Sequence, residues 1–508
     1  MAGVDVARYR GGVVARAVAI TLLAGLVRLI LGALTPLFPD ETYYWDWSRH
    51  LSGGYFDHPP LIAWLIRFGT LIAGDTPAGV RLGPIIAGTL AGLFIADSAR
   101  RLTGDRAAVN AALVFALMPL SAAGLVLATP DAPLFACAAA TIWAVIRALD
   151  APARSRAALQ WWAVAGIFLG LAMASKYTAV LLPLGIVVAL LVRRGLRHRL
   201  AEPGPYVATV IAVVVFSPVI VWNAEHGWAS FAFQLSHGLT RATGSVLKRE
   251  LDLVGGQLGL VTPVLFVMLV LAVVRSGHTG TRALLAIVAT VVFGFFMYSA
   301  TKRRPEANWP ALAYVPGILV LVAHAGTPRW DKWLRGGLVL AGVLTAVTYV
   351  NTFTPVLPVP ARRDPVARSH GWKELADSVN QTYGPRLSIS SHRTWVGADR
   401  YQEASELAFH LPDRPQTFSL NLTTRPNHYD FWPQFPERAH PRDGLLLVVD
   451  EVAGEHPTLK SLSQHFESVV QKEMVTLARE GDPVKYLRIW HLERWRGTWP
   501  ERPLRSRS

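Results

Sequence analysis

The chain has 508 residues, of which 52% are hydrophobic, and a formal net charge of +15. Long apolar runs fill residues 13–352, which excludes an ordinary soluble protein, whose polar and apolar stretches alternate. The positive charge does not indicate nucleic-acid binding, because Lys and Arg collect in the cytoplasmic loops of membrane proteins. The single cysteine, Cys137, excludes both an intrachain disulfide and a cysteine-based metal site.

The apolar runs predict a polytopic α-helical membrane domain over residues 1–352. A spanning helix needs about 20 mostly apolar residues, and it must satisfy its own backbone hydrogen bonds in lipid. The first run has no convincing cleavage site, so we interpret it as an uncleaved span. About eleven spans are expected, at residues 13–37, 78–98, 107–127, 132–149, 160–174, 178–192, 205–222, 254–274, 283–300, 310–325 and 335–352.

The distribution of charge orients these spans. Lys and Arg greatly outnumber Asp and Glu in the loops near 100–106, 147–156, 193–202, 275–282 and 329–335, which we therefore expect to be cytoplasmic. An odd number of spans then places residues 353–508 outside, on the side of the membrane opposite these basic loops. This part is polar, and its strand-like runs DGLLLVVDE and VKYLRIWHL alternate with helical stretches, which predicts a soluble C-terminal α/β domain.

The first outer loop, residues 38–77, carries the first candidate site residues. Its many Trp and Tyr residues favour a helix that lies along the membrane surface, with the rings at headgroup level. Asp40 and Glu41 follow the first span directly, and adjacent carboxylates at a low-dielectric boundary repel each other. This repulsion would raise the pKa of one of them, as a general base requires. The alternative is that the two acids only mark the end of the span.

Further polar residues are expected on the same side. Asp131, in LATPDAPLF, begins the fourth span and is either a functional acid or a residue that stabilises the helix terminus. Asp57 and His58 supply a carboxylate and an imidazole just before a Pro-Pro pair. Several Lys and Arg residues are expected on this outer side, although the positive-inside rule disfavours them there. They are Arg81, Lys176, Lys248, Arg249, Lys302, Arg303 and Arg304.

These misplaced cations indicate an anionic ligand such as a phosphate or diphosphate. The alternative is attraction to anionic lipid headgroups. Carboxylates opposite cations at a membrane surface suit group transfer from a phosphorylated lipid, in which a carboxylate deprotonates the acceptor hydroxyl and cations stabilise the departing phosphate. Such a donor is already activated, so the chemistry requires no further cofactor and no metal. The sequence contains no Walker loop and no dinucleotide fingerprint.

Several of these motifs resemble those of a known family. The chain is similar to the GT-C integral-membrane glycosyltransferases, in the bacterial branch related to protein O-mannosyltransferases (family 39) and to the lipid A aminoarabinose transferases. The stretches that carry the resemblance run along nearly the whole chain: PDETYYWDWSRHLSGGYFDHPPLIAWL, LATPDAPLF, ASKYTAVLLP, VWNAEHGWASFAFQLSHG, GGQLGLVTP, RRPEANWPALAY and GADRYQEASELAFHLP.

The resemblance implies a polyprenyl-phosphate sugar donor and transfer with inversion on the extracytoplasmic face. It also implies that Asp40 is the catalytic carboxylate with Glu41 beside it, and that Asp131 is the second acidic position. Asp57-His58 stands where the aminoarabinose transferases carry a Glu-Lys pair, so histidine replaces lysine here. Glu306, Asn308 and Trp309 lie in a loop similar to that of other members.

Two alternatives are open at this point. The first is a transporter or flippase for a lipid-linked sugar, which would favour broken helices near the midplane and repeated halves. The sequence shows no internal repeat, and its charges gather on one side. The second keeps the enzyme class but leaves the acceptor undecided between a lipopolysaccharide or other envelope glycolipid and a protein hydroxyl.

Overall fold

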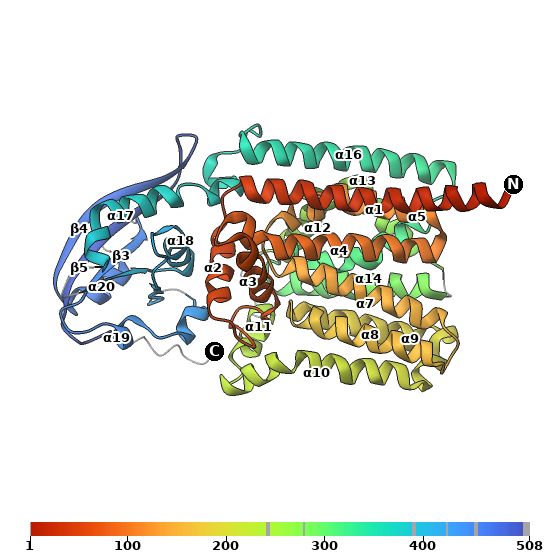
Figure 1. The fold of residues 1–508 in the computed structure, drawn as a ribbon, viewed down its shortest axis with the longest axis horizontal. Helices are drawn as coiled ribbons and strands as arrows, with labels where there is room; N and C mark the ends of the chain where they lie inside the picture. Colours follow the sequence, from red (N-terminus) through yellow and green to blue (C-terminus); the bar gives the residue numbers. More distant parts are fainter. Residues whose placement is uncertain are drawn as a thin grey trace. The chain divides into compact units, whose positions relative to one another are not determined.

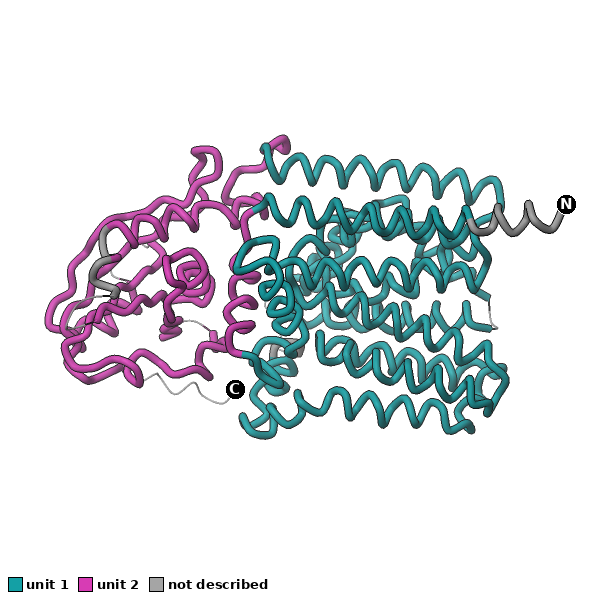
Figure 2. The backbone as a smooth tube through the Cα atoms, in the orientation of Figure 1, with its two compact units in different colours: residues 1–35, 51–354 teal, residues 36–50, 355–508 magenta. Residues whose placement is uncertain are grey.

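A computed structural model describes residues 2–239, 244–277, 280–388, 393–422, 425–451 and 456–500. The chain forms two compact units (Figure 2). Unit 1 contains residues 1–35 and 51–354, and unit 2 contains residues 36–50 and 355–508. Unit 2 therefore combines the C-terminal part of the chain with a short segment that follows the first helix.

Unit 1 is a helical bundle whose long helices lie roughly side by side (Figure 1). Its α-helices are α1 (Ala2–Leu34), α3 (Leu61–Ala73), α4 (Pro77–Thr103), α5 (Asp105–Leu117), α6 (Pro119–Ala122), α7 (Asp131–Asp150), α8 (Arg156–Met173), α9 (Leu181–Val192), α10 (Pro203–Glu225), α11 (Ala229–Leu239), α12 (Val246–Val261), α13 (Pro263–Val274), α14 (Gly280–Lys302), α15 (Tyr314–Val322) and α16 (Pro328–Phe353). Short 3-10 helices are η1 (Gly124–Val126), η2 (Tyr177–Val180), η3 (Arg194–Ala201) and η4 (Trp309–Ala313).

The helical membrane fold is confirmed, with fewer straight spans than expected. Among the described residues, seven helices are long and apolar enough to cross a membrane, or up to ten if each bent pair forms one span. The expected span 310–325 is a shorter apolar helix, Trp309–Val322. Two of the bends follow from proline: Pro119 starts α6 after a 69° bend, and Pro263 starts α13 after a bend of 107°.

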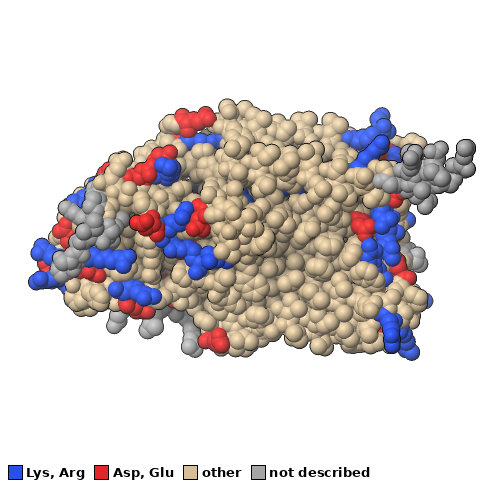
Figure 3. Space-filling model, viewed as in Figure 1, with Lys and Arg blue, Asp and Glu red and all other residues tan. Residues whose placement is uncertain are grey.

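The surface of unit 1 is that of a protein in lipid. Large apolar side chains are exposed along α1, α10 and α16, including Leu23, Val214 and Val339. A soluble monomer does not expose apolar surface on this scale, because such surface drives association. On the face drawn in Figure 3, a broad band of unit 1 carries few charged side chains, and Lys and Arg gather at one end. The chain is a multi-pass integral membrane protein.

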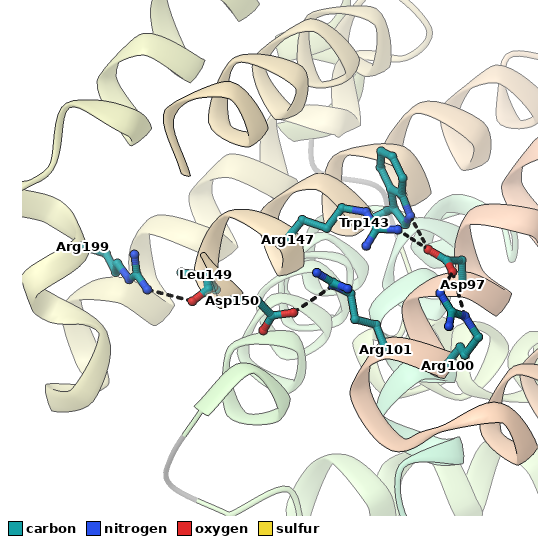
Figure 4. A network of polar contacts seen from close by, with 8 residues as sticks. All are labelled: Asp97, Arg100, Arg101, Trp143, Arg147, Leu149, Asp150 and Arg199. Carbon is teal, nitrogen blue, oxygen red and sulfur yellow. Dashed lines mark hydrogen bonds and ion pairs between the residues drawn. The ribbon is translucent and has the colours of Figure 1, made fainter. Parts of the chain in front are cut away.

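Polar contacts join the predicted cytoplasmic loops at one end of unit 1. Arg101 of α4 pairs with Asp150 of α7 at 3.0 Å, and Arg199 of η3 donates to the Leu149 carbonyl at 2.7 Å (Figure 4). Nearby, Asp97 accepts from Trp143 and from the guanidinium groups of Arg100 and Arg147. Arg106 pairs with Asp331 at the start of α16, and His324 contacts the Arg275 carbonyl. These five loops therefore lie on one side, as their charge predicted.

Unit 2 is built around a five-stranded mixed sheet with the order β2-β1-β3-β5-β4. β1 pairs in parallel with β2 and β3, whereas β5 pairs antiparallel with β3 and β4. The strands are β1 (Thr394–Ala398), β2 (Thr417–Ser419), β3 (Gly444–Asp450), β4 (Phe466–Arg479) and β5 (Asp482–Trp495). The helices are α2 (Pro39–Arg49), η5 (Ala361–Arg363), η6 (Val366–Ser369), α17 (Trp372–Ser388), α18 (Tyr401–His410), η7 (His428–Phe431), α19 (Phe435–Arg438) and α20 (Pro457–Ser463).

The aromatic side chains of α2 are buried within unit 2. Trp45 and Trp47 are both 0% exposed. The ring of Trp45 packs edge-on against Phe409 of α18, and Trp47 contacts His428 of η7. The prediction that these rings anchor a helix at the membrane surface was therefore wrong. The sequence did not reveal that their partners lie more than 350 residues further along the chain.

A buried carboxyl of α18 faces α2. Glu406 is fully buried, and its Oε2 lies 3.3 Å from Nε2 of His410. Burial raises the pKa of Glu406 to about 7; His410 opposes this rise, and the charge of Glu41 adds to it. A carboxyl whose pKa is raised on folding stabilises the fold while it is protonated, so this contribution is complete below about pH 4.5 and is lost as the pH rises through about 7.

We therefore predict that unit 2 is less stable at pH 8 than at pH 6. Glu406→Gln, which is neutral at both pH values, should reduce the difference between the two thermal unfolding midpoints. Circular dichroism of the purified protein in detergent measures both midpoints. An unchanged difference in the variant would contradict the assignment of this pH dependence to Glu406.

Candidate active site

The adjacent acids Asp40 and Glu41 have different environments in unit 2. Glu41 is 0% exposed, and its Oε2 accepts a hydrogen bond from the Phe38 amide at 3.0 Å, which caps the start of α2. Asp40 is exposed, and its Oδ1 accepts a hydrogen bond from the Tyr401 hydroxyl at 3.0 Å. The two carboxylates are therefore not equivalent: the Glu41 side chain is buried at the start of α2, whereas the Asp40 side chain is exposed.

Unit 1 brings together three residues that the sequence singled out separately. Asp131 is the first residue of α7, and its Oδ1 lies 2.7 Å from Nζ of Lys176. Its Oδ2 accepts a hydrogen bond of 2.8 Å from Nδ2 of Asn308. The side chains of Asp131 and Lys176 are only 14% and 11% exposed. Such a desolvated ion pair is costly to form, which favours a functional explanation over a role at the helix terminus alone.

Asp57 and His58 lie in the turn before α3, beside the Lys176 segment. The Leu61 amide donates to the Ala174 carbonyl at 3.0 Å, which fixes the end of this turn against the segment that follows α8. On its other side, Gln234 of α11 donates to the Asp57 carbonyl at 2.8 Å. Asp57 is 5% exposed, and His58 is partly exposed. The turn is therefore held by backbone contacts close to the Asp131–Lys176 pair.

The segment after α14 presents a cation next to this pair. The guanidinium of Arg303 lies over the Trp309 ring, 5.2 Å from its centroid, and Trp309 directly follows Asn308. Burial lowers the pKa of Arg303, while the charge of Glu306 raises it. Among the described residues, the buried Nε of Arg303 has no hydrogen-bond partner. An anion that accepted from this nitrogen would offset the cost of burying the charge.

Helix α12 braces this segment. Arg249 donates from Nε to the Ala300 carbonyl at 3.0 Å and from Nη2 to the Thr301 carbonyl at 2.9 Å, so it satisfies carbonyls at the end of α14. Two turns later, Nε2 of Gln257 donates to the Ala307 carbonyl at 2.9 Å. The sequence predicted Arg249 as a ligand-binding residue. Its contacts with these carbonyls show that it also supports the segment, which a sequence cannot reveal.

The remaining predicted cations fall into two groups. Arg81 is 0% exposed, and its Nη1 donates to the Gly32 and Thr35 carbonyls at the end of α1, so its contacts also explain it as a structural residue. Three others stay near the surface. Lys248 is exposed, Lys302 lies over the Tyr298 ring, and Arg304 pairs at 3.5 Å with Asp252 while its side chain is 75% exposed.

Sequence reasoning missed two supporting residues. Gln257 is fully buried and accepts from the Tyr314 hydroxyl at 2.7 Å while it holds the Ala307 carbonyl. Next to it, a Cβ at Gly256 would lie 2.6 Å from Cβ of Ala307, so only glycine permits this close approach. Both residues lie in the stretch GGQLGLVTP, which carried part of the family resemblance. Their location in that stretch was the available signal.

Comparisons with known proteins give matches to glycosyltransferases. Residues 57–222 match the family described as dolichyl-phosphate-mannose-protein mannosyltransferase. The chain is 28% identical over 326 residues to the lipid A galacturonosyltransferase RgtD of Rhizobium johnstonii, and 24% identical over 347 residues to the lipopolysaccharide core galacturonosyltransferase RgtA of the same organism. Each match covers 63% of this chain, and they span 67% and 63% of the respective relatives.

The fold is also that of a solved glycosyltransferase structure. Apo ArnT from Cupriavidus metallidurans superposes with a TM-score of 0.64 and 20% identity, over 93% of this chain and 97% of that chain. The same protein bound to undecaprenyl phosphate gives a TM-score of 0.62 at 18% identity. The chain is thus similar to the integral-membrane glycosyltransferases of the GT-C type, in the branch related to protein mannosyltransferases.

The contacts of Asp131 lead to a test by a double-mutant cycle. Asp131→Asn leaves the Lys176 ammonium largely buried without a counter-charge, and it should lower the free energy of unfolding by about 3 kcal/mol. In the double variant Asp131→Asn/Lys176→Met, the loss should be smaller than the sum of the single losses, with a coupling energy of about 1–3 kcal/mol. Unfolding in detergent measures all four proteins. Losses that add within about 0.5 kcal/mol would contradict the ion pair.

Proposed function

We propose that this protein transfers a sugar from a polyprenyl phosphate to a hydroxyl of a lipopolysaccharide glycolipid, with Asp40 as the general base. The observation that carries the proposal is the contrast between two adjacent carboxylates. Glu41 is buried and its side chain accepts from the Phe38 amide, whereas Asp40 is exposed and its Oδ1 accepts a hydrogen bond from the Tyr401 hydroxyl. A general base needs this combination of access and fixed orientation.

The polyprenyl-phosphate donor is supported by the cations of unit 1. Arg303 has an unpaired buried Nε, and Lys176 offers an ammonium already fixed by Asp131. Guanidinium and ammonium groups in a desolvated site bind phosphate strongly. The structure of ArnT with undecaprenyl phosphate supports the same ligand class. We include Asp57, His58, Glu306 and Asn308 among the residues that surround the donor or acceptor.

The proposed reaction is a single displacement at the anomeric carbon. Asp40 takes the proton of the acceptor hydroxyl as its oxygen forms the new glycosidic bond, and the bond from the anomeric carbon to the phosphate oxygen breaks. The electron pair of that bond leaves on the polyprenyl phosphate, whose negative charge Arg303 and Lys176 stabilise. Attack opposite the leaving group inverts the anomeric configuration.

The proposed acceptor is a glycolipid of the lipid A or lipopolysaccharide core class. The names of RgtD and RgtA support it, because these relatives act on those two acceptors. Both acceptors belong to the bacterial envelope, and the charge of the loops supports an inner-membrane protein with residues 355–508 outside. The glycosyltransferase comparisons count against the transporter alternative.

A pair of neighbouring substitutions tests the assignment of Asp40. Asp40→Asn should lower kcat by about 10²–10⁴-fold, because it removes the base. Glu41→Gln should retain most activity, since the glutamine carbonyl can also accept a hydrogen bond from the Phe38 amide. Transfer of radiolabelled sugar to lipid A measures both variants at matched expression. Near-normal transfer by Asp40→Asn would refute the role of Asp40 as the base. Equal losses in the two variants would refute the distinction between the roles of Asp40 and Glu41.

Two neighbouring arginines provide the matching test for the donor site. Arg303→Met should raise KM for the polyprenyl-phosphate sugar by about 10–100-fold, because a charge-assisted hydrogen bond is lost. Arg304→Met should change KM less than about fivefold, because its ion pair is largely exposed. Donor titration of each purified variant gives KM. An unchanged KM in Arg303→Met would contradict donor binding by Arg303 and favour an interaction of this residue with lipid headgroups.

A further inference from the structure

Helix α18 contacts the start of α2 along one face. Tyr401 and Ser405 are four residues apart and so lie on the same side of α18. The Tyr401 hydroxyl donates to Oδ1 of Asp40 at 3.0 Å. One turn later, Ser405 Oγ lies 3.0 Å from Oγ1 of Thr42 and donates to the Pro39 carbonyl at 3.3 Å. All of these residues belong to unit 2, so the C-terminal part of the chain holds the helix terminus that carries Asp40.

Tyr401 is itself held in place. Its ring centroid lies 4.3 Å from that of Tyr43, which follows Asp40 by one turn of α2. The guanidinium of Arg425 lies 5.5 Å from the centroid of the same ring. Because packing fixes the ring, the hydroxyl approaches Asp40 from a defined direction. A donor held in this way restricts the rotamer of a carboxylate and stabilises its charged form.

We propose that Tyr401 is a positioning residue for Asp40, so that residues 355–508 take part in the reaction by orienting its base. The proposal rests on the proposed function, in which Asp40 accepts the proton of the acceptor hydroxyl. Tyr401 donates to Oδ1 and so fixes the orientation of the carboxylate. The tyrosine acts through Asp40 and is not a catalytic residue, because it stays hydrogen-bonded to the carboxylate while the chemistry takes place.

The test uses Tyr401→Phe in the full-length protein, since this change keeps the ring against Tyr43 and removes only the hydroxyl. We expect kcat to fall about tenfold, because a hydrogen bond to a charged group is lost. KM for the polyprenyl-phosphate sugar should stay within twofold, since the proposed donor contacts come from Arg303 and Lys176. The acid limb of the pH profile of kcat/KM should move to higher pH, because the carboxylate has lost a donor that favours its charged form.

Tyr429→Phe is the matched control. The Tyr429 hydroxyl donates to Oδ2 of Asp46 at 2.7 Å, so this change removes the same kind of bond from the same helix at a residue that is not the base. Tyr429→Phe should lower the thermal unfolding midpoint and leave the acid limb where it is. A shift of the acid limb in Tyr401→Phe alone supports the positioning role. Equal shifts in both variants would show a general loosening of α2 and would overturn it.

The failure of this proposal can be told apart from the failure of the proposed function. If Tyr401→Phe keeps the wild-type kcat and pH profile while Asp40→Asn is inactive, Tyr401 has no positioning role and Asp40 is still the base. If Asp40→Asn is active, Asp40 is not the base, and both proposals fall together.

Discussion

The packing of α2 onto the C-terminal part of unit 2 is the interaction on which the candidate chemistry depends, because this helix carries Asp40. A short helix has little stability of its own in water. Here Trp45 and Trp47 are buried in unit 2, and Glu41 caps the first turn. Burial of two indole rings contributes several kcal/mol, by the usual relation of about 25 cal/mol per Å² of apolar surface. Aromatic packing of α2 thus fixes the position of Asp40, although the Asp40 carboxylate is itself exposed.

A second constraint acts in unit 1, where charge is kept in a poorly solvated place. Asp131 and Lys176 bury most of their side chains, and Asn308 satisfies the remaining carboxylate oxygen. Replacing such a pair with apolar residues is often neutral or stabilising, so its presence is weak evidence for stability alone. The residues that support this site bind the backbone instead of pairing with another charge. Arg249 and Gln257 bind backbone carbonyls and fix the segment that leads to Arg303 and Asn308.

The sequence predicted the helical membrane fold, the mixed C-terminal domain and the position of the basic loops together at one end of the bundle, because hydropathy and charge act locally along the chain. It also singled out Asp131 and Lys176, although their pairing across 45 positions required the structure. Contacts between residues far apart in the sequence were not predictable. The sequence marked Arg249 as misplaced without revealing its carbonyl partners. It placed the aromatic rings of residues 38–77 at the membrane surface without revealing that Trp45 packs against Phe409. Tyr401 lies in the stretch GADRYQEASELAFHLP, which carries part of the family resemblance, but its contact with Asp40 was not predictable.

Transfer of a sugar from a lipid phosphate to a lipopolysaccharide glycolipid can be measured directly. The most direct measurement uses the purified full-length protein in lipid nanodiscs, with lipid A and a series of polyprenyl-phosphate sugars, including a uronic acid and an amino sugar. Mass spectrometry then follows both substrates. We expect lipid A to gain one sugar residue for each polyprenyl phosphate released. The proposed transfer is wrong if every donor in the series stays intact, or if a donor is hydrolysed while lipid A gains no sugar.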